Sequence, residues 1–148
     1  MLSISHGLTG ALIATKIPNP LLSTPLILAS HYIEDWILHW DFGTGLSSGK
    51  RRKSTAIVLE CCDLCVTAIL VYWWFQHGSE IPNWQAWYGT FIGLLPDFLE
   101  APRNFFKFNP LWLKPLNDFH HGFHHSTSNI LIGLLPQILV VGFIFWFK

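Results

Sequence analysis

Four long apolar stretches constrain what this chain can fold into more than any other feature. They cover residues 21–40, 55–75, 84–99 and 130–147. About 20 apolar residues in a helix cross the ~30 Å hydrocarbon core of a bilayer, and a backbone in that core must satisfy its own hydrogen bonds. The stretches therefore predict an all-α integral membrane helical bundle with about four spanning helices.

The overall composition agrees with a membrane location. Hydrophobic residues make up 51% of the 148 residues and charged residues only 12%, which is about half the usual share in soluble domains. Two shorter segments, residues 3–17 and 117–129, predict half-buried helices packed under the bundle. The length favours a single membrane domain, 1–148. The N-terminal segment lacks a basic region and a cleavage site, so we interpret it as part of the mature chain.

Basic residues gather in two places, which gives the bundle a predicted orientation. One is the run of residues 50–53, and the other is formed by Arg103, Lys107 and Lys114. Cytoplasmic loops carry an excess of Lys and Arg, so both places are predicted to face the cytoplasm. Aromatic residues interleave with the second group and favour membrane lipids as partners. The formal net charge of +0 gives no support for nucleic acid as a partner.

Ionisable residues interrupt the apolar segments at helical spacings. Each such residue at membrane depth costs roughly 2.5–3.5 kcal/mol on insertion scales, so it normally faces a partner or a wet cavity. His31, Asp35 and His39 are four residues apart, which places them in one stripe on a helix. Glu60 and Asp63 are three apart and also share a helix face. The predicted orientation brings these groups toward the cytoplasmic side.

Four of the eight histidines lie close together between residues 120 and 125. On a helix, His120 neighbours His124 and His121 neighbours His125, so the two pairs point in different directions. Not all four can then bind one centre. A histidine that binds a metal also needs an acceptor for its other ring nitrogen. Candidate acceptors for these rings are Glu34, Asp41, Glu100 and Asp118.

Four short pieces of the sequence resemble one known family. They are SHGLTGALIA with His6, SHYIED with His31 and Asp35, GLLPD with Asp97, and HHGFHHS with His120 and His125. These pieces are similar to the signatures of the inner-membrane metal-dependent hydrolases, a helical family akin to the zinc-dependent phospholipase C and P1 nuclease superfamily. The resemblance implies a zinc cluster that hydrolyses phosphoesters at an inner (plasma) membrane. The ligands that it implies are His6, His31, Asp35, Asp97, His120 and His125.

The order of these pieces differs from the usual order in the family. The family usually places SHxxxD last, whereas here it precedes the pieces that contain Asp97 and His120. Leu99 also stands where a second acidic residue usually follows LPD. The resemblance is therefore in the pieces and not in their arrangement along the chain.

Spacing and resemblance together predict a divalent metal centre, with zinc as the first choice and manganese, magnesium or iron as alternatives. Asp35, Asp63 or Asp97 is expected to bridge two ions or to accept a proton from water, and Arg103 to steady a phosphate. The predicted reaction is hydrolysis of a lipid phosphate or phospholipid head group at the cytoplasmic face. The predicted metal ligands are His6, His31, Asp35, His39, Asp63, Asp97, His120, His121, His124 and His125.

Other functions remain open at this point. HGFHH, with His121, His124 and His125, resembles one histidine box of the membrane di-iron lipid desaturases and hydroxylases. Those enzymes usually have three such boxes, and no second HxxHH occurs here. The same ligand inventory also suits transport of a metal ion or protons, or a purely structural network between helices. The sequence does not determine the number of subunits.

Overall fold

The computed structural model describes residues 1–46 and 48–148 of the chain. This described part contains six α-helices, a π-helical turn and no β-strand, so the predicted all-α class is confirmed. The turn, Tyr72–Gln76, directly continues the third helix. The helices are α1 (Ser3–Lys16), α2 (Pro20–Trp36), α3 (Lys53–Val71), α4 (Trp84–Phe106), α5 (Lys114–Phe123) and α6 (Ile130–Phe147).

Asparagine residues define where three of these helices begin. Asn19, Asn83 and Asn129 each accept a backbone N–H from the first turn of α2, α4 and α6, respectively. The first N–H groups of a helix have no partner within it, so a polar side chain just before the helix stabilises its start. The polar residues ahead of three apolar segments therefore set the helix boundaries.

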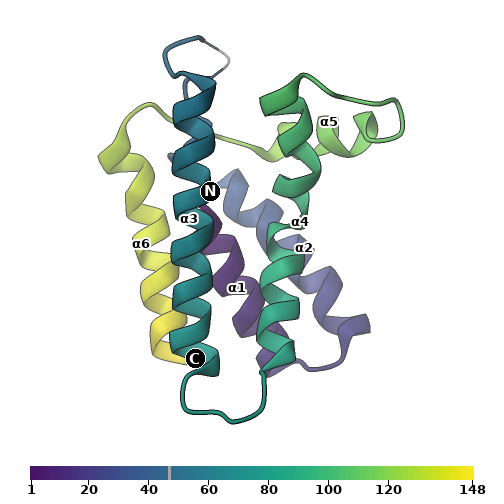
Figure 1. Cartoon of the computed structure of the whole chain (residues 1–148), viewed down its shortest axis with the longest axis vertical. Coiled ribbons are helices and arrows are strands. Elements are labelled where there is room, and N and C mark those ends of the chain that lie inside the picture. Colours follow the sequence, from purple (N-terminus) through teal and green to yellow (C-terminus); the bar gives the residue numbers. More distant parts are fainter. Residues whose placement is uncertain (47) are drawn as a thin grey trace.

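The helices surround α1, and α5 lies across one end of the bundle (Figure 1). α1 packs against α2, α3, α4 and α6, and it buries Leu8, Ala11 and Ala14. The turn between α3 and α4 lies at the opposite end from α5. A central helix with this many neighbours can bring side chains from distant parts of the chain to one place.

α1 and α4 approach each other at glycine residues. A Cβ atom added to Gly10 would lie 2.1 Å from the backbone oxygen of Gly89. A Cβ added to Gly93 would lie 2.4 Å from the backbone oxygen of His6. Only glycine permits two helix backbones to come this close. These contacts place the first turns of α1 directly against the middle of α4.

Two helical stretches are long and apolar enough to cross a membrane: Lys53–Gln76 and Ile130–Phe147, with mean hydropathies of 1.9 and 2.4. Only 22% and 17% of their most apolar windows are buried, so most of their apolar side chains face outward. The other two predicted spans form α2 and α4, which do not pass the same test of length and hydropathy. Of the four predicted spans, the third helix with its π-helical turn and α6 are therefore long and apolar enough to cross a membrane.

The observed helix ends differ from the predicted ones in three places. α2 ends at Trp36 and not at residue 40, α4 continues to Phe106 past residue 99, and α5 covers Lys114–Phe123 instead of 117–129. The stretch after α2 leaves the helix because its backbone pairs with residues 125–127. There the His39 N–H donates to the carbonyl oxygen of His125 at 3.1 Å.

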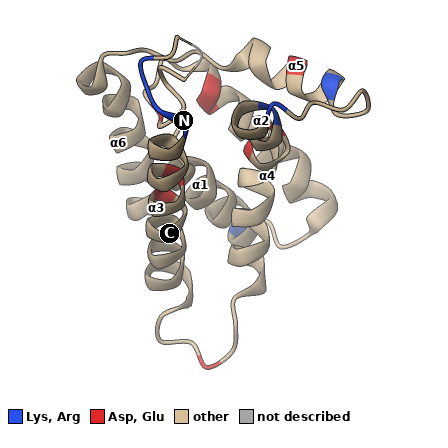
Figure 2. Ribbon diagram, turned by 45° about the horizontal axis from the view of Figure 1, so that its top comes forward, with Lys and Arg blue, Asp and Glu red and all other residues tan. Residues whose placement is uncertain are grey.

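Charged residues gather at the end of the bundle that α5 covers (Figure 2). The two basic groups meet there, since Lys53 Nζ lies 3.5 Å from the carbonyl oxygen of Phe105. The two basic segments therefore lie side by side, as the predicted orientation required. The polar candidate residues in α2, α4 and α5 are found at this same end.

Candidate metal centre

Two groups of side chains in this region are placed to hold a metal ion. The first consists of His31, Asp35, Asp97 and His120, and the second of Asp35, His39 and His124. Within each group, one ligand atom per residue lies within 4.8 Å of every other. Asp35 belongs to both groups, so its carboxylate lies between two neighbouring positions for a cation.

The two oxygens of Asp35 face different histidines. Oδ2 lies 2.9 Å from Nε2 of His120 and 3.4 Å from Nε2 of His31. Oδ1 lies 3.1 Å from Nε2 of His6 and 3.8 Å from Nε2 of His39. Asp35 is fully buried, with 0% of its surface exposed. A buried carboxylate is stable only when charged or hydrogen-bonding groups compensate it, and four imidazoles converge on this one.

Backbone carbonyls fix the orientation of two of these imidazole rings. His31 donates its Nδ1–H to the carbonyl oxygen of Gly93 at 2.7 Å, and His39 donates its Nδ1–H to that of Ile37 at 2.8 Å. A carbonyl can only accept, so the ring proton resides on Nδ1 in both cases. Each Nε2 then presents a lone pair to the site, as in histidines that bind metal.

In the other two rings, those of His6 and His120, a carboxylate oxygen instead of a carbonyl oxygen lies next to Nδ1. Nδ1 of His6 lies 2.8 Å from Oε2 of Glu34, and Nδ1 of His120 lies 3.3 Å from Oε2 of Glu100. All four of these side chains are buried. A carboxylate behind a histidine raises the basicity of the ring and strengthens its bond to a metal. Glu34 and Glu100 therefore lie beside the rings that they were predicted to face, although neither contact has hydrogen-bond geometry.

Pairs of Nε2 atoms face each other across both positions. Nε2 of His31 lies 3.2 Å from Nε2 of His120, and Nε2 of His39 lies 3.2 Å from Nε2 of His124. Two neutral rings with their protons on Nδ1 would place two lone pairs against each other. Such a contact is favourable with a cation between the two atoms, or with a proton on one of them. The residues present thus fit a metal ion in each group.

Asp41 and His124 add an ion pair beside the second group. Oδ2 of Asp41 lies 3.2 Å from Nε2 of His124 and 3.4 Å from Nε2 of His39. Burial raises the pKa of Asp41, but hydrogen bonds from His124 and His39 lower it more, so it lies below its usual value. Burial alone would lower the pKa of His124, but the hydrogen bond and the charge of Asp41 raise it by more than that, so it lies above its usual value. The contact therefore favours the charged form of both side chains.

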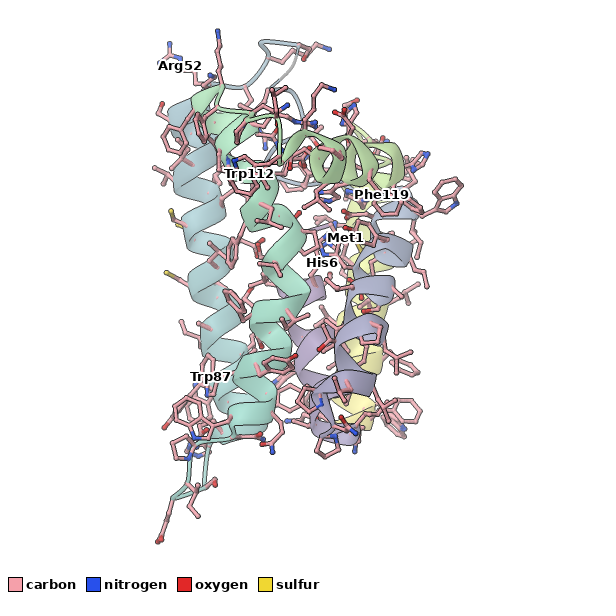
Figure 3. All side chains as sticks on the ribbon, turned by 90° about the vertical axis from the view of Figure 1, so that its right-hand side faces the viewer. Met1, His6, Arg52, Trp87, Trp112 and Phe119 are labelled. Carbon is pink, nitrogen blue, oxygen red and sulfur yellow. The ribbon has the colours of Figure 1, made fainter. Side chains whose placement is uncertain are left out.

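The amino group of Met1 also enters the site, next to His6 in the interior of the bundle (Figure 3). It contacts Oδ1 of Asp35 and lies 2.9 Å from Nε2 of His6. Both the amino group and the Asp35 carboxylate are buried. The positive charge in this position offsets the charge of Asp35, as a metal cation would do.

Most of the predicted ligands lie together in the structure. Five of the site residues predicted from the sequence fall outside the two groups: His6, which nevertheless contacts Asp35, and Asp63, His121, His125 and Arg103. The residues that meet around Asp35 are His6, His31, His39, Asp97, His120 and His124.

Asp63 has a contact of a different kind from a metal ligand. Its Oδ2 accepts the backbone N–H of Ser3 at 2.6 Å. This bond satisfies one of the N–H groups at the start of α1 and places a negative charge at the positive end of that helix. In this structure Asp63 therefore holds α1 against α3.

His125, which the resemblance implies as a ligand, points away from both groups. It donates its Nδ1–H to the carbonyl oxygen of Phe123 at 2.8 Å, and its ring packs edge-on against Trp36 with centroids 4.7 Å apart. Its neighbour His124 faces the second group instead. The helix ends at Phe123, so His125 does not share a helix face with His121 as predicted, whereas the rings of His120 and His124 remain neighbours with centroids 6.2 Å apart.

Arg103 is paired with carboxylates of the protein. It donates to Oε1 of Glu100, and its Nη1 lies 3.4 Å from Oδ1 of Asp118. Since Glu100 faces Nδ1 of His120, Arg103 reaches the first group through Glu100. Asp118, one of the predicted acceptors, pairs with Arg103 and Lys114 rather than with a histidine.

A cavity of about 590 Å³ lies beside the two groups. Asp97 and His124 line it together with Asp41, so both groups border the same space. Lys53 and Arg103 contribute positive charge to its wall. His121, which is exposed, also lines this cavity. A ligand in the cavity would therefore contact the metal positions and basic side chains at once.

Comparison with known proteins gives no match for this chain, whether with family models, curated proteins or solved structures. The function of the chain is therefore inferred from the chemistry of the site and from its position in the fold.

Proposed function

We propose that this chain is a membrane-embedded metal-dependent hydrolase that cleaves a phosphoester of a membrane lipid at the cytoplasmic face. The observation that carries the proposal is the pair of facing Nε2 contacts around a shared, buried Asp35. Four of the imidazoles at the site have an oxygen behind Nδ1. Structural ion pairs do not need this arrangement, whereas metal sites use it regularly.

The donor set favours zinc. Imidazole nitrogens together with a few carboxylate oxygens suit borderline metals, and catalytic zinc sites combine histidine with carboxylate ligands. His31, Asp35, Asp97 and His120 would hold one ion, and Asp35, His39 and His124 the other. A metal bound there polarises a phosphoryl oxygen and lowers the pKa of water.

Asp97 is the group best placed to handle a proton. About 33% of its side chain is exposed, whereas that of Asp35 is fully buried, and Asp97 lines the cavity. Its Oδ1 lies 3.6 Å from Nε2 of His120. A carboxylate at the boundary between the ligand group and the cavity can orient an attacking water and accept its proton. We therefore assign Asp97 the general-base role.

The positions of the helices support a membrane arrangement. We propose that α3 and α6 span the bilayer together with α2 and α4, with the basic loop 50–53 in the cytoplasm. α5 would then lie in the interface, because it crosses the end of the bundle, carries Phe119 and follows directly after the turn that contains Trp112 (Figure 3). Exposed aromatic side chains beside lysines are typical of interfacial segments. The site would open toward lipid head groups.

The test is a hydrolysis assay on the purified chain in detergent. We expect zinc- or manganese-loaded protein to release phosphate, or a phosphorylated head group, from lipid phosphates. A chelator should abolish the release, and Asp97→Asn should lower the rate by roughly 10²–10⁴-fold, the usual size of a general-base contribution. A folded protein that contains no metal and hydrolyses none of a broad phospholipid panel would overturn the proposal. Bound iron with an oxidised lipid product would instead indicate oxygen chemistry.

A further inference from the structure

We infer that the cavity beside the metal groups is a binding site for a lipid with one phosphate, held by Lys53 and Lys107, with its chain along α3. The reaction of such a lipid rests on the proposed function, but its binding does not. The inference comes from the order in which charged and apolar residues line the cavity.

One stripe of α3 forms a wall of the cavity. Lys53, Ile57, Cys61 and Leu64 all line it, and their spacing of four, four and three residues places them on one helix face. The stripe begins with a positive charge, continues with apolar side chains and is roughly 16 Å long in total at 1.5 Å per residue. An amphiphile with an anionic head and an apolar chain complements this order.

The end of α4 forms the opposite wall and brings a second lysine. Phe98, Phe105 and Phe106 line the cavity from α4, and Lys107 follows in the left-handed conformation that ends this helix. Lys107 makes no ion pair with any residue that the structure describes. Lys53 is within 3.5 Å of the carbonyl oxygen of Phe105, so it lies at the same end of the cavity.

These two lysines are better suited to an external phosphate than Arg103 is. Arg103 already pairs with Glu100 and Asp118, so binding a phosphate would require it to leave two carboxylates. Lys53 contacts only a neutral carbonyl oxygen among the described residues. An ammonium group without a carboxylate partner gains most from an added anion.

The size and remaining charge of the cavity restrict the ligand further. A volume of about 590 Å³ is within the usual range for a small-molecule site, which suits one head group and the first part of one chain. Glu60 also lines the cavity, next to Cys61 on α3. Its carboxyl group offers no positive charge for a second phosphate deeper inside. The volume of the cavity and the position of the two lysines at one end therefore suit a lipid with a single phosphate.

The three cysteines of α3 provide a direct test, because Cys61 lines the cavity and Cys62 does not. Both are exposed. Two full-length, metal-loaded variants in detergent would retain one cysteine each: Cys62→Ala with Cys65→Ala, and Cys61→Ala with Cys65→Ala. The probe is decylphosphonate, which has no ester bond to hydrolyse. The alkylation rate of the remaining cysteine by a small maleimide is then measured with and without the probe.

Decylphosphonate at ten times its Kd should slow alkylation of Cys61 roughly tenfold and leave Cys62 unchanged. Methylphosphonate, decanol and inorganic phosphate at the same concentration should protect Cys61 far less. Lys53→Gln should weaken the protection by decylphosphonate roughly tenfold, which is the usual effect of one charged hydrogen bond. Lys107→Gln should do the same, whereas Lys16→Gln, in α1 away from the cavity, should not.

Equal protection of Cys61 and Cys62, or none at Cys61, would overturn the inference. The inference would also be overturned if decylphosphonate protected Cys61 equally well in Lys53→Gln, in Lys107→Gln and in the protein with both lysines. Because the probe is not hydrolysed, this outcome is distinct from failure of the proposed function. Protection without any lipid hydrolysis would support the binding site and contradict the hydrolase. Hydrolysis without protection of Cys61 would support the hydrolase and contradict the binding site.

Discussion

His31 and His120 face each other with their Nε2 atoms 3.2 Å apart, although they belong to α2 and α5 and are separated by 89 residues in sequence. The Nδ1–H of His31 is already donated to Gly93, so the proton of His31 is not available to join the two Nε2 atoms. A cation or a second proton must stabilise the contact. A cation there makes the cluster a metal centre, whereas a shared proton makes it a hydrogen-bonded network, and metal analysis distinguishes the two.

The shared position of Asp35 predicts how mutations change the amount of bound metal. Asp35→Asn keeps the size of the side chain and removes its charge from between the two groups, so we expect both ions to be lost. His124→Ala should remove only the ion of the second group. Elemental analysis of the purified variants gives the metal content per chain.

His77→Ala is the matched control for this experiment, because His77 lies in the turn at the other end of the bundle. Its metal content should equal that of the unmodified chain. An unchanged metal content in both Asp35→Asn and His124→Ala would mean that the cluster is structural.

The carboxylate behind His120 predicts a smaller effect on metal affinity. Glu100→Gln keeps an oxygen near Nδ1 of His120 but removes the negative charge, so we expect the affinity of the first group to fall by about 10–100-fold. Competition with a chelator of known affinity measures this change. Glu80→Gln, in the exposed turn before α4, should leave the affinity unchanged, and an equal effect of both variants would contradict the assignment.

The sequence predicts much of this architecture because hydrophobic patterning acts locally. The apolar segments identify α3 and α6 closely, and the 4-residue spacing of His31 and Asp35 correctly places both on one face of α2. The four-residue spacing fails for His39, since α2 ends before it. His39 reaches Asp35 all the same, through tertiary hydrogen bonds.

The remaining features depend on contacts between distant segments, which have no local signal. The choice of His124 over His125 depends on the end of α5 at Phe123, after which the chain turns and pairs with residue 39. The carbonyl oxygens of Gly93 and Ile37 hold two imidazoles, and no side-chain pattern reveals a carbonyl direction. The cap that Asp63 provides for α1 likewise depends on how α1 and α3 pack.

The close approach of α1 and α4 predicts that a methyl group between them destabilises the fold. A Cβ at Gly89 would lie 2.1 Å from the backbone oxygen of Gly10, so the helices must move apart. Gly89→Ala should lower the free energy of unfolding by about 1–3 kcal/mol, the usual cost of overpacking, and weaken metal binding at the proposed site. Thermal unfolding in detergent measures the first effect, and metal affinity the second.

Gly142→Ala provides the control for this packing experiment. Gly142 is inside α6, and a Cβ there would have no atom within 4 Å. Alanine should therefore be neutral, or stabilise the helix by up to about 1 kcal/mol. Equal losses of stability in Gly89→Ala and Gly142→Ala would contradict the close backbone contact as the cause.

The ion pair of Asp41 and His124 predicts a pH dependence of metal binding. The pKa of His124 is raised, since Asp41 outweighs the effect of burial. In the metal-free protein the pair therefore stabilises the fold below the ordinary histidine pKa, and this contribution is lost as pH rises through the raised pKa. A metal needs the unprotonated Nε2, so it must displace this proton. The affinity of the second group should rise with pH up to the raised pKa and then level off.

Asp41→Asn removes the charge that raises the pKa of His124, so the midpoint of this pH dependence should move to lower pH even if the maximal affinity also changes. Zinc titrations of the purified variant between pH 5 and about 9 would give the midpoint, and proton release on zinc addition would report the same group. Asp118→Asn, which removes a carboxylate near Lys114 and outside both groups, should not move it. A midpoint that Asp41→Asn leaves in place would show that another residue supplies the displaced proton.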